Sequence, residues 1–204
     1  MYYLAQMKTR PAYIVFAGIN GAGKTTLYKS NMWQTDITPV ELHRVNPDEI
    51  IRTNQLNPNC EKDQLKAGKI AVRKIDKYFK NLESFSHETV LAGRSSIKRI
   101  EVAKEMGYCV IINYVGLKDC QLAINRIAYR VQLGGHNIDS ELVRKRWNTS
   151  LENLKLVCNI CDEVHVFDNT NLLKEIAMWH DGTLCWWGAN QELGGWLIDA
   201  MLNE

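Results

Sequence analysis

The stretch that decides the fold is GINGAGKTTLY, which runs from Gly18 to Tyr28. It contains the spacing G-x-x-x-x-G-K-[ST]. Glycines at these positions let backbone N–H groups turn toward phosphate oxygens, and the N-terminus of the following helix adds a positive dipole. We expect Lys24 to bridge the outer phosphates and the Thr25 hydroxyl to bind Mg²⁺. The stretch therefore predicts a nucleoside triphosphate site formed by Gly18, Asn20, Gly21, Ala22, Gly23, Lys24, Thr25 and Thr26.

The segments around this loop alternate between strand and helix patterns. Short apolar runs predict strands at 12–18, 42–46, 88–93, 107–116 and 162–168. Helical patterns lie at 61–82, 95–106, 118–133 and 139–156, with one more helix from Lys24 onward and a hairpin and helix in the tail, 183–204. Such alternation implies right-handed βαβ crossovers. We therefore expect an α/β protein with the P-loop NTPase fold, in which a mostly parallel sheet carries helices on both faces.

Composition limits the possible classes of protein. At 204 residues the chain is expected to form a single domain over 1–204. A net charge of +2 gives no general reason to expect nucleic acid or a membrane surface as a partner. No apolar run approaches the roughly 18 residues that span a bilayer, and the opening residues lack a signal-peptide pattern, so we expect a cytoplasmic protein. The cysteines should then be reduced, and burial is favoured over zinc binding for Cys158 and Cys161.

The fate of the γ-phosphate depends on the residues near the loop. Motor and switch ATPases usually carry paired acids at the end of an apolar strand, and no predicted strand ends in such a pair. Asp168 follows a strand alone, which favours a turn residue. Transfer to a second substrate needs a carboxylate that accepts the hydroxyl proton, arginines that neutralise charge, and a lid that excludes water. The sequence offers candidates for all three.

Asp48 is the candidate carboxylate. With Glu49 it lies in VNPDEI (Val45 to Ile50), directly after the predicted second strand. Ligands of open α/β folds bind at this carboxyl edge of the sheet. The alternative is that Asp48 caps the helix that follows.

The lid is expected at about residues 133–146. Gly134 and Gly135 in LGGHNI end one helix and permit a mobile loop. Arginines flank this loop on both sides: Arg126, Arg130, Arg144 and Arg146. For any single one of them a solvated helix face is an equally good interpretation, and His136 is favoured as an exposed loop residue rather than a phosphate ligand.

Four segments together resemble the zeta toxin family, in particular its short, predicted-ATPase branch. These segments are FAGINGAGKTTLY, VNPDEI, HETVLAGRSS and AINRIAYRVQLGGHNIDSELVRKRWNTSLENL, and the resemblance runs from about Tyr13 to Asn169. It implies a P-loop kinase-like domain that uses ATP or GTP with Mg²⁺ to phosphorylate the 3′-hydroxyl of UDP-N-acetylglucosamine. It also implies a toxin restrained by a small helical antitoxin.

The resemblance implies roles for single residues as well. Asp48 falls on the family's catalytic base, and Lys24 and Thr25 fall on its phosphate and Mg²⁺ contacts. Arg130, with Arg144 or Arg146, would surround the triphosphate, and Arg126 is a further nucleotide-binding candidate.

The substrate contacts implied by the resemblance are Asp48, Glu49, Glu88 and Arg94. Glu88 lies farther from Gly93 and Arg94 than the corresponding acid of the full-length toxins, and the chain is shorter than theirs. The identity of the acceptor is therefore the weakest implication of the resemblance.

Other functions stay open at this point. One is a metabolite kinase without a toxic role. Another is a protein whose nucleotide site controls partner binding, which predicts that Asp48→Asn leaves function intact while Lys24→Ala abolishes it.

Overall fold

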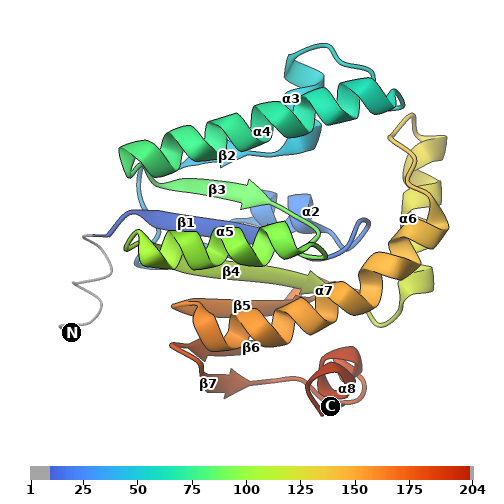
Figure 1. Ribbon diagram of the computed structural model, residues 1–204. Helices are drawn as coiled ribbons and strands as arrows, with labels where there is room; N and C mark the ends of the chain where they lie inside the picture. Colours follow the sequence, from blue (N-terminus) through green and yellow to red (C-terminus); the bar gives the residue numbers. More distant parts are fainter. Residues whose placement is uncertain (1–9, 203–204) are drawn as a thin grey trace.

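The computed structural model describes residues 10–202 and has an α/β architecture built on one sheet (Figure 1). The strand order is β2-β3-β1-β4-β5-β6-β7. The strands are β1 (Ala12–Ala17), β2 (His43–Val45), β3 (Phe85–Glu88), β4 (Cys109–Gly116), β5 (Glu163–Asp168), β6 (Lys174–His180) and β7 (Thr183–Trp187). Strands β1 to β5 pair in parallel, and β6 and β7 extend the sheet antiparallel. The predicted fold class, α/β with a mostly parallel sheet, is confirmed.

Helices cover both faces of this sheet. They are α2 (Lys24–Ser30), α3 (Pro47–Thr53), α4 (Glu61–Asn81), α5 (Arg94–Glu105), α6 (Cys120–Gln132), α7 (Ser140–Ile160) and α8 (Gly195–Leu202). One apolar core joins the sheet to α4, α5, α8 and the second half of α7, and the other joins it to α2 and α6. Because Val143 belongs to the second core and Leu154 to the first, α7 passes from one face of the sheet to the other (Figure 1). Within residues 10–202, every helix is too short or too polar to cross a membrane.

The phosphate loop follows directly from the buried central strand β1, which fixes its position. All its side chains, AYIVFA, are at most 2% exposed, because β3 and β4 pair on either side and helices cover both faces. The chains leaving the parallel strands therefore meet at one edge of the sheet. This carboxyl edge carries the loop Gly18–Gly23 and the segments that follow β2 and β3.

Gly18 and Gly21 give the loop its path. Both have positive φ angles, +126° and +81°, which side chains rarely adopt. A Cβ atom on Gly18 would lie 2.2 Å from the carbonyl oxygen of Val115 in β4. The loop thus lies against the neighbouring strand at a distance that only glycine permits.

The strand predicted at 88–93 is wrong, because β3 ends at Glu88 where that prediction begins. Ser86 and His87 are buried polar residues, so the strand FSHE lacks the apolar run by which strands are usually found. After Glu88 the chain turns away, with Leu91 at φ +59° and its N–H donating to Thr89 Oγ1. Because β3 ends at Glu88, this residue lies at the carboxyl edge of the sheet, where the phosphate loop lies.

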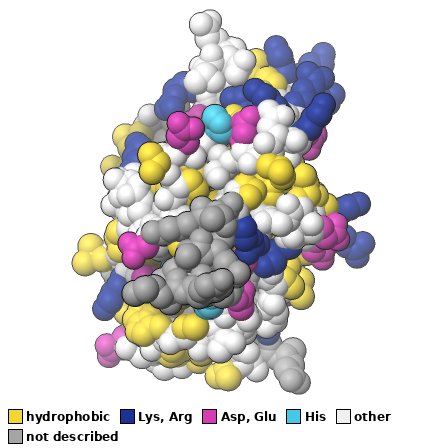
Figure 2. Space-filling model, turned by 90° about the vertical axis from the view of Figure 1, so that its left-hand side faces the viewer, with side chains coloured by type: hydrophobic (Ala, Val, Ile, Leu, Met, Phe, Trp, Pro, Cys, Tyr) yellow, Lys and Arg dark blue, Asp and Glu magenta, His cyan; other side chains and the backbone are white. Residues whose placement is uncertain are grey.

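The tail forms the expected hairpin and helix, although the first strand of the hairpin, β6, begins before the predicted range. Asp168, expected in a turn, is instead the last residue of β5; its carboxylate accepts hydrogen bonds from the backbone N–H and hydroxyl of Thr170, and also from Trp196 Nε1, so it fixes the segment that follows the strand. Figure 2 views the opposite, amino-end side of the sheet, where basic side chains gather near the end of α4.

Candidate active site

The predicted nucleotide-binding residues Gly18 to Thr26 form the loop after β1 and the first turn of α2. Lys24 is only 7% exposed, and its ammonium group donates to the carbonyl oxygens of Gly18 at 2.9 Å and Ile19 at 3.1 Å. Burial lowers the pKa of Lys24, an effect that the nearby charges of Glu88 and Asp48 partly offset. A buried cation whose hydrogen bonds go to carbonyl groups is suited to exchange them for phosphate oxygens.

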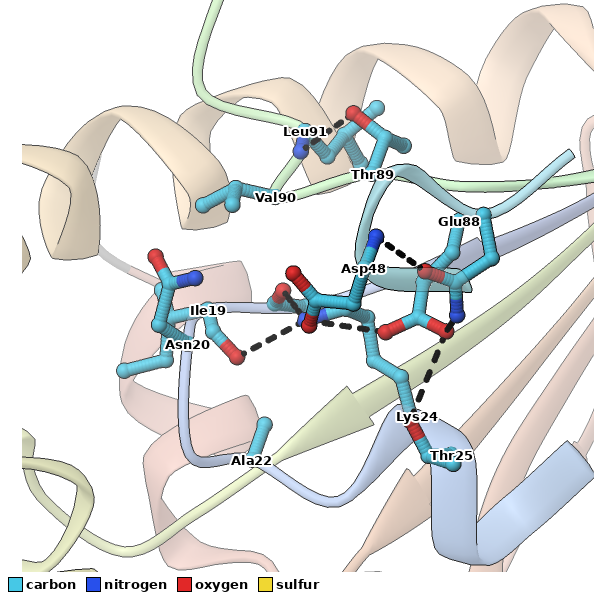
Figure 3. Close-up of polar contacts among 12 residues, drawn as sticks. Ile19, Asn20, Ala22, Lys24, Thr25, Asp48, Glu88, Thr89, Val90 and Leu91 are labelled. Carbon is cyan, nitrogen blue, oxygen red and sulfur yellow. Dashed lines mark hydrogen bonds and ion pairs between the residues drawn. The ribbon is translucent and has the colours of Figure 1, made fainter. Parts of the chain in front are cut away.

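Asp48 lies in the first turn of α3, beside the phosphate loop. The N-cap of this helix is Asn46, whose side-chain oxygen accepts from the backbone N–H groups of Asp48 at 2.8 Å and Glu49 at 3.4 Å. The alternative that Asp48 caps the helix is therefore wrong. Its carboxylate is exposed, and Figure 3 shows it facing the same space as Lys24 and Glu88.

Glu88 joins three elements at the edge of the sheet. Its carboxylate accepts hydrogen bonds from Asn46 Nδ2 at 2.6 Å and Arg44 Nη2 at 3.3 Å, and it lies 4.0 Å from Lys24 Nζ. The Thr25 hydroxyl donates to the same carboxylate at 3.5 Å (Figure 3). A carboxylate and a hydroxyl at the edge of a phosphate loop are the oxygen ligands that Mg²⁺ takes beside a nucleotide, so the residues present fit this ion.

Two cavities meet at Asp48. One has a volume of about 320 Å³ and lies between β3, α4 and α5, with His87, Ser95 and Arg99 in its lining. The other, of about 420 Å³, lies under the predicted lid and reaches His136 and Arg146. Because Asp48 lines both, its carboxylate lies between a space under the lid and a space at the end of β3.

The structure separates the four candidate arginines. Arg130 and Arg146 are close enough to Lys24 to lower its pKa, and Arg146 Nη1 donates to Asn20 Oδ1 in the phosphate loop at 3.1 Å. Arg126 instead donates to the carbonyl oxygens of Asn169 and Thr170, in the loop after β5. Asn169 in turn donates to the Ala22 carbonyl at 2.8 Å, so Arg126 supports the phosphate loop indirectly.

Arg144 lies away from Lys24 and the phosphate loop. It is exposed, donates to Gln121 at 3.1 Å, and lies 3.5 Å from Glu141 one turn earlier on α7. Of the pair that the sequence left open, Arg146 is the residue that faces the phosphate loop.

The predicted lid lies over the second cavity. Gly135 packs against Arg130, where a Cβ atom would lie 2.6 Å from Arg130 Cγ. Arg130 Nη2 donates to the carbonyl oxygen of His136 at 2.9 Å, and among the described residues its Nε has no partner. The His136 ring lies 3.3 Å from Asn59 Oδ1, so the lid touches the segment before α4 rather than a phosphate position.

Two predicted substrate residues lie elsewhere. Glu49 accepts from Arg44 Nε at 2.8 Å, and the structure does not place it in the lining of either cavity. Arg94 is exposed and lines a separate groove between α5 and α7.

Sequence reasoning missed several residues of the site. Arg44 bridges Glu49 and Glu88, and its guanidinium carbon lies 3.4 Å from the centre of the Tyr28 ring. Nothing in a three-residue strand indicates this role in advance. Helical spacing is a sequence signal for Arg99. It lies four residues after Ser95, so the two residues share one face of the helix predicted at 95–106.

His87 lies beside Glu88 in the cavity between β3, α4 and α5. Its Nδ1 lies 3.2 Å from the hydroxyl of buried Tyr13. Burial, helped by the charge of Arg99, lowers the pKa of His87 to about 3, so the ring is neutral at physiological pH. It therefore adds no positive charge to the cavity.

Comparison with known proteins identifies a relative of this chain. The chain is 33% identical over 135 residues to a protein of Haemophilus influenzae described as an uncharacterized protein, a match covering 66% of this chain and 91% of that protein. No model of a known protein family matches the sequence.

Solved structures share the fold. The AvrRxo1-ORF1:-ORF2 structure with ATP matches at 13% identity and a TM-score of 0.69, over 99% of this chain and 72% of that chain. A structure from the PezAT chromosomal toxin–antitoxin system of Streptococcus pneumoniae matches at 17% identity and a TM-score of 0.59, over 87% and 71% of the two chains. The fold that the zeta toxin resemblance implied is therefore confirmed.

Proposed function

This chain belongs to the same family as the Haemophilus influenzae protein and shares its fold with the AvrRxo1 and PezAT structures, and from these relationships we propose that it is an ATP-dependent kinase. It transfers the γ-phosphate to a hydroxyl of a nucleotide sugar, by the zeta toxin resemblance UDP-N-acetylglucosamine. One of the solved structures of this fold contains ATP, which favours ATP over GTP as the donor.

The position of Asp48 carries the proposal. Its carboxylate borders both cavities and is near enough to Lys24 to raise the pKa of the ammonium group. Among the described residues, no side chain donates a hydrogen bond to the Asp48 carboxylate, so its oxygens are free to accept a proton. A nucleotide bound on the loop and an acceptor in the cavity beside β3 would meet at this carboxylate.

Each residue of the site has a separate role in the proposed reaction. Lys24 and the loop N–H groups bind the outer phosphates, and Arg130 and Arg146 neutralise the charge that spreads over the transferring group. Asp48 takes the proton of the attacking hydroxyl and orients its oxygen. The part of the predicted lid that precedes α7, residues 133–139, excludes water from the same space, which favours transfer over hydrolysis.

Thr25 and Glu88 would hold Mg²⁺ beside the phosphates. When bound, this ion supplies positive charge to the β- and γ-phosphate oxygens. Glu88 then has a structural role as well, since it ties Asn46 and Arg44 to the phosphate loop.

The same comparisons support the proposal of a protein partner. The PezAT structure comes from a toxin–antitoxin system, and the AvrRxo1 structure holds two open reading frame products. We extend this to a small antitoxin that restrains the present chain. Growth arrest on expression supports the toxin, whereas unimpaired growth with kinase activity in vitro favours the metabolite kinase.

The decisive experiment compares wild type with Asp48→Asn. Purified protein is incubated with ATP, Mg²⁺ and a panel of nucleotide sugars headed by UDP-N-acetylglucosamine, and products heavier by one phosphoryl group are measured by mass spectrometry. Loss of a general base lowers the rate by about 10²- to 10⁴-fold while the affinity for ATP stays the same.

Asp76→Asn is the matched control, because Asp76 is exposed on α4 and lines neither cavity. It should turn over like wild type. Full product formation by Asp48→Asn would exclude Asp48 as the general base, whereas no product from wild type on any acceptor would favour the partner-binding function.

A further inference from the structure

Helix α4 carries a row of basic side chains along its outer side, and Figure 2 shows basic side chains gathered near the end of this helix. Successive members of the row are three or four residues apart, and a helix places residues at that spacing on one side. The other side, with Ala67, Ala71, Ile75 and Phe79, is buried against the sheet. The row is exposed and extends over about 27 Å of helix. We call it the basic row: Lys62, Lys66, Lys69, Arg73, Lys77 and Lys80.

The charges of the basic row are not matched by acids. In the part of the chain that the structure describes, ion pairs to the basic row are absent, although α4 also contains Glu61, Asp63 and Asp76. By contrast, Lys104 on α5 pairs with Asp162. Like charges at helical spacing repel one another and destabilise the helix, whereas a solvated helix face usually alternates charges of opposite sign. The basic row is therefore suited to an anionic ligand that relieves this repulsion.

An apolar groove of about 710 Å³ lies beside the basic row. Leu65 and Val72 line it and are 60% and 44% exposed, and Gly68 leaves open space between them. Lys69 and Arg73 belong both to the groove and to the basic row. The surface thus places cations and an exposed apolar strip side by side along one helix. This arrangement fits a ligand with regularly spaced negative charges on one side and apolar faces on the other.

A single strand of nucleic acid has this chemistry. It carries one phosphate per nucleotide, and the faces of its bases are apolar. A flexible strand can follow a straight row of cations, whereas the backbone of a duplex winds away from it. A membrane surface is a poorer fit, because the continuous apolar side of α4 is packed against the sheet and is not available for insertion.

From this arrangement we propose that α4 binds single-stranded nucleic acid, with phosphates along the basic row and bases against Leu65 and Val72. The net charge of the whole chain, +2, gives no sign of this surface, because its charge is concentrated on one helix. Gly68 and Val72 also line the cavity beside β3, so a bound strand lies next to that cavity. The inference goes beyond the proposed kinase and does not rest on it.

The binding experiment uses a fluorescently labelled DNA strand of about 20 thymine nucleotides, in the absence of ATP and acceptor. Fluorescence anisotropy measures its affinity for the protein at several salt concentrations. Wild type is compared with the double variant Lys69→Gln and Arg73→Gln. The matched control is the double variant Lys98→Gln and Lys145→Gln, which removes the same charge from exposed positions on α5 and α7. Because all four side chains are exposed, we expect the melting temperatures of both double variants to be close to that of wild type.

The salt dependence gives the sharpest expectation. Contact of the whole basic row with phosphates predicts a slope of about −4 for the logarithm of the association constant against the logarithm of the salt concentration. The variant of Lys69 and Arg73 should reduce this slope to about −3 and weaken binding at low salt by about 10- to 100-fold. The control should bind within about 2-fold of wild type.

Leu65→Ser tests the apolar groove separately from the charges. Leu65 is exposed, so its replacement should not affect folding. We expect binding to weaken by about 5-fold with an unchanged salt slope, because an uncharged contact is lost. An affinity equal to that of wild type would exclude base contacts in the groove.

Other results would overturn the inference. These are no binding of the strand by wild type at low salt, equal losses in the two double variants, and tighter binding of a duplex of the same length. Vesicles that contain phosphatidylserine and a polyglutamate peptide are tested in parallel. Binding of either one without binding of the strand would assign the basic row to a membrane surface or to an acidic protein.

The outcomes also separate this surface from the kinase. Strand binding that depends on Lys69 and Arg73, without phosphoryl transfer to any acceptor, would refute the kinase and leave the surface. Phosphoryl transfer by a protein that does not bind the strand would refute the surface and leave the kinase.

Discussion

The charged side chains at the two ends of the parallel strands differ in whether they have partners of opposite charge. At the amino edge, which faces the viewer in Figure 2, Asp162 is 2% exposed and accepts from Arg10, Lys104 and the backbone N–H of Val110, each at 2.8 Å. At the carboxyl edge Glu88 is paired with Arg44, but among the described residues Arg99 has no carboxylate partner and Arg130 Nε has no hydrogen-bond partner. Matched charges hold the fold together, whereas unmatched charges around a cavity are available to a ligand.

The largest effect that would test this contrast is on catalysis. Arg146→Ala removes a cation from the phosphate loop, and we expect the transfer rate to fall by roughly 10³-fold, near the lower end for arginines that stabilise a transferring phosphoryl group, because Arg130 remains. The rate is measured with the acceptor identified for wild type, and the melting temperature should be unchanged.

Lys145→Ala is the matched control for Arg146→Ala. Lys145 is the preceding residue on α7, is exposed and lines neither cavity, so its loss should leave the rate unchanged. If the two variants lose activity equally, α7 acts only as a scaffold, and the unmatched charge of Arg146 has no special role.

Much of the carboxyl edge could be predicted because its geometry is local. The phosphate loop follows from glycine and lysine spacing, and the position of Asp48 after β2 follows from a short strand and Pro47 at the start of a helix. These features depend on residues that are neighbours in the chain.

The remaining contacts depend on residues far apart in the chain. β3 was misplaced because Ser86 and His87 are buried polar residues whose environment is set by β1 and β2. The choice between Arg144 and Arg146 depends on how α7 is rotated against the sheet, and two residues on one helix carry no local sign of that rotation. The sequence also cannot show that Arg99 lacks a carboxylate partner among the described residues, since this depends on every neighbour that packs around it.

The second prediction concerns the amino edge. Asp162→Asn leaves Arg10 and Lys104 without their carboxylate, and we expect the free energy of unfolding to fall by about 3 kcal/mol, at the lower end for breaking a buried pair because the amide oxygen still accepts one hydrogen bond. Chemical denaturation measures this change. The kinetic constants of the folded variant should match those of wild type, and a selective loss of activity would contradict the division between the two edges.

The third prediction is a dependence of stability on pH where β5 meets the antiparallel extension. His165 on β5 lies 2.7 Å from Glu175 and 3.2 Å from Glu163. Burial alone would lower the pKa of His165, but the hydrogen bonds to the two glutamates outweigh it and raise the pKa from 6.5 to about 9. The folded protein therefore keeps a proton that the unfolded chain releases above its own pKa of 6.5.

The stabilisation from this proton is complete below pH 6.5 and is lost as the pH rises toward about 9. We expect the free energy of unfolding to fall by about 2 kcal/mol across this interval, less than the full shift implies because the cluster titrates as a unit. Denaturation curves of wild type and His165→Gln at several pH values measure the effect, since the variant lacks the titrating group and should show a flatter profile. An equal slope in both proteins would assign the pH dependence to other groups and would remove His165 from the set of matched charges.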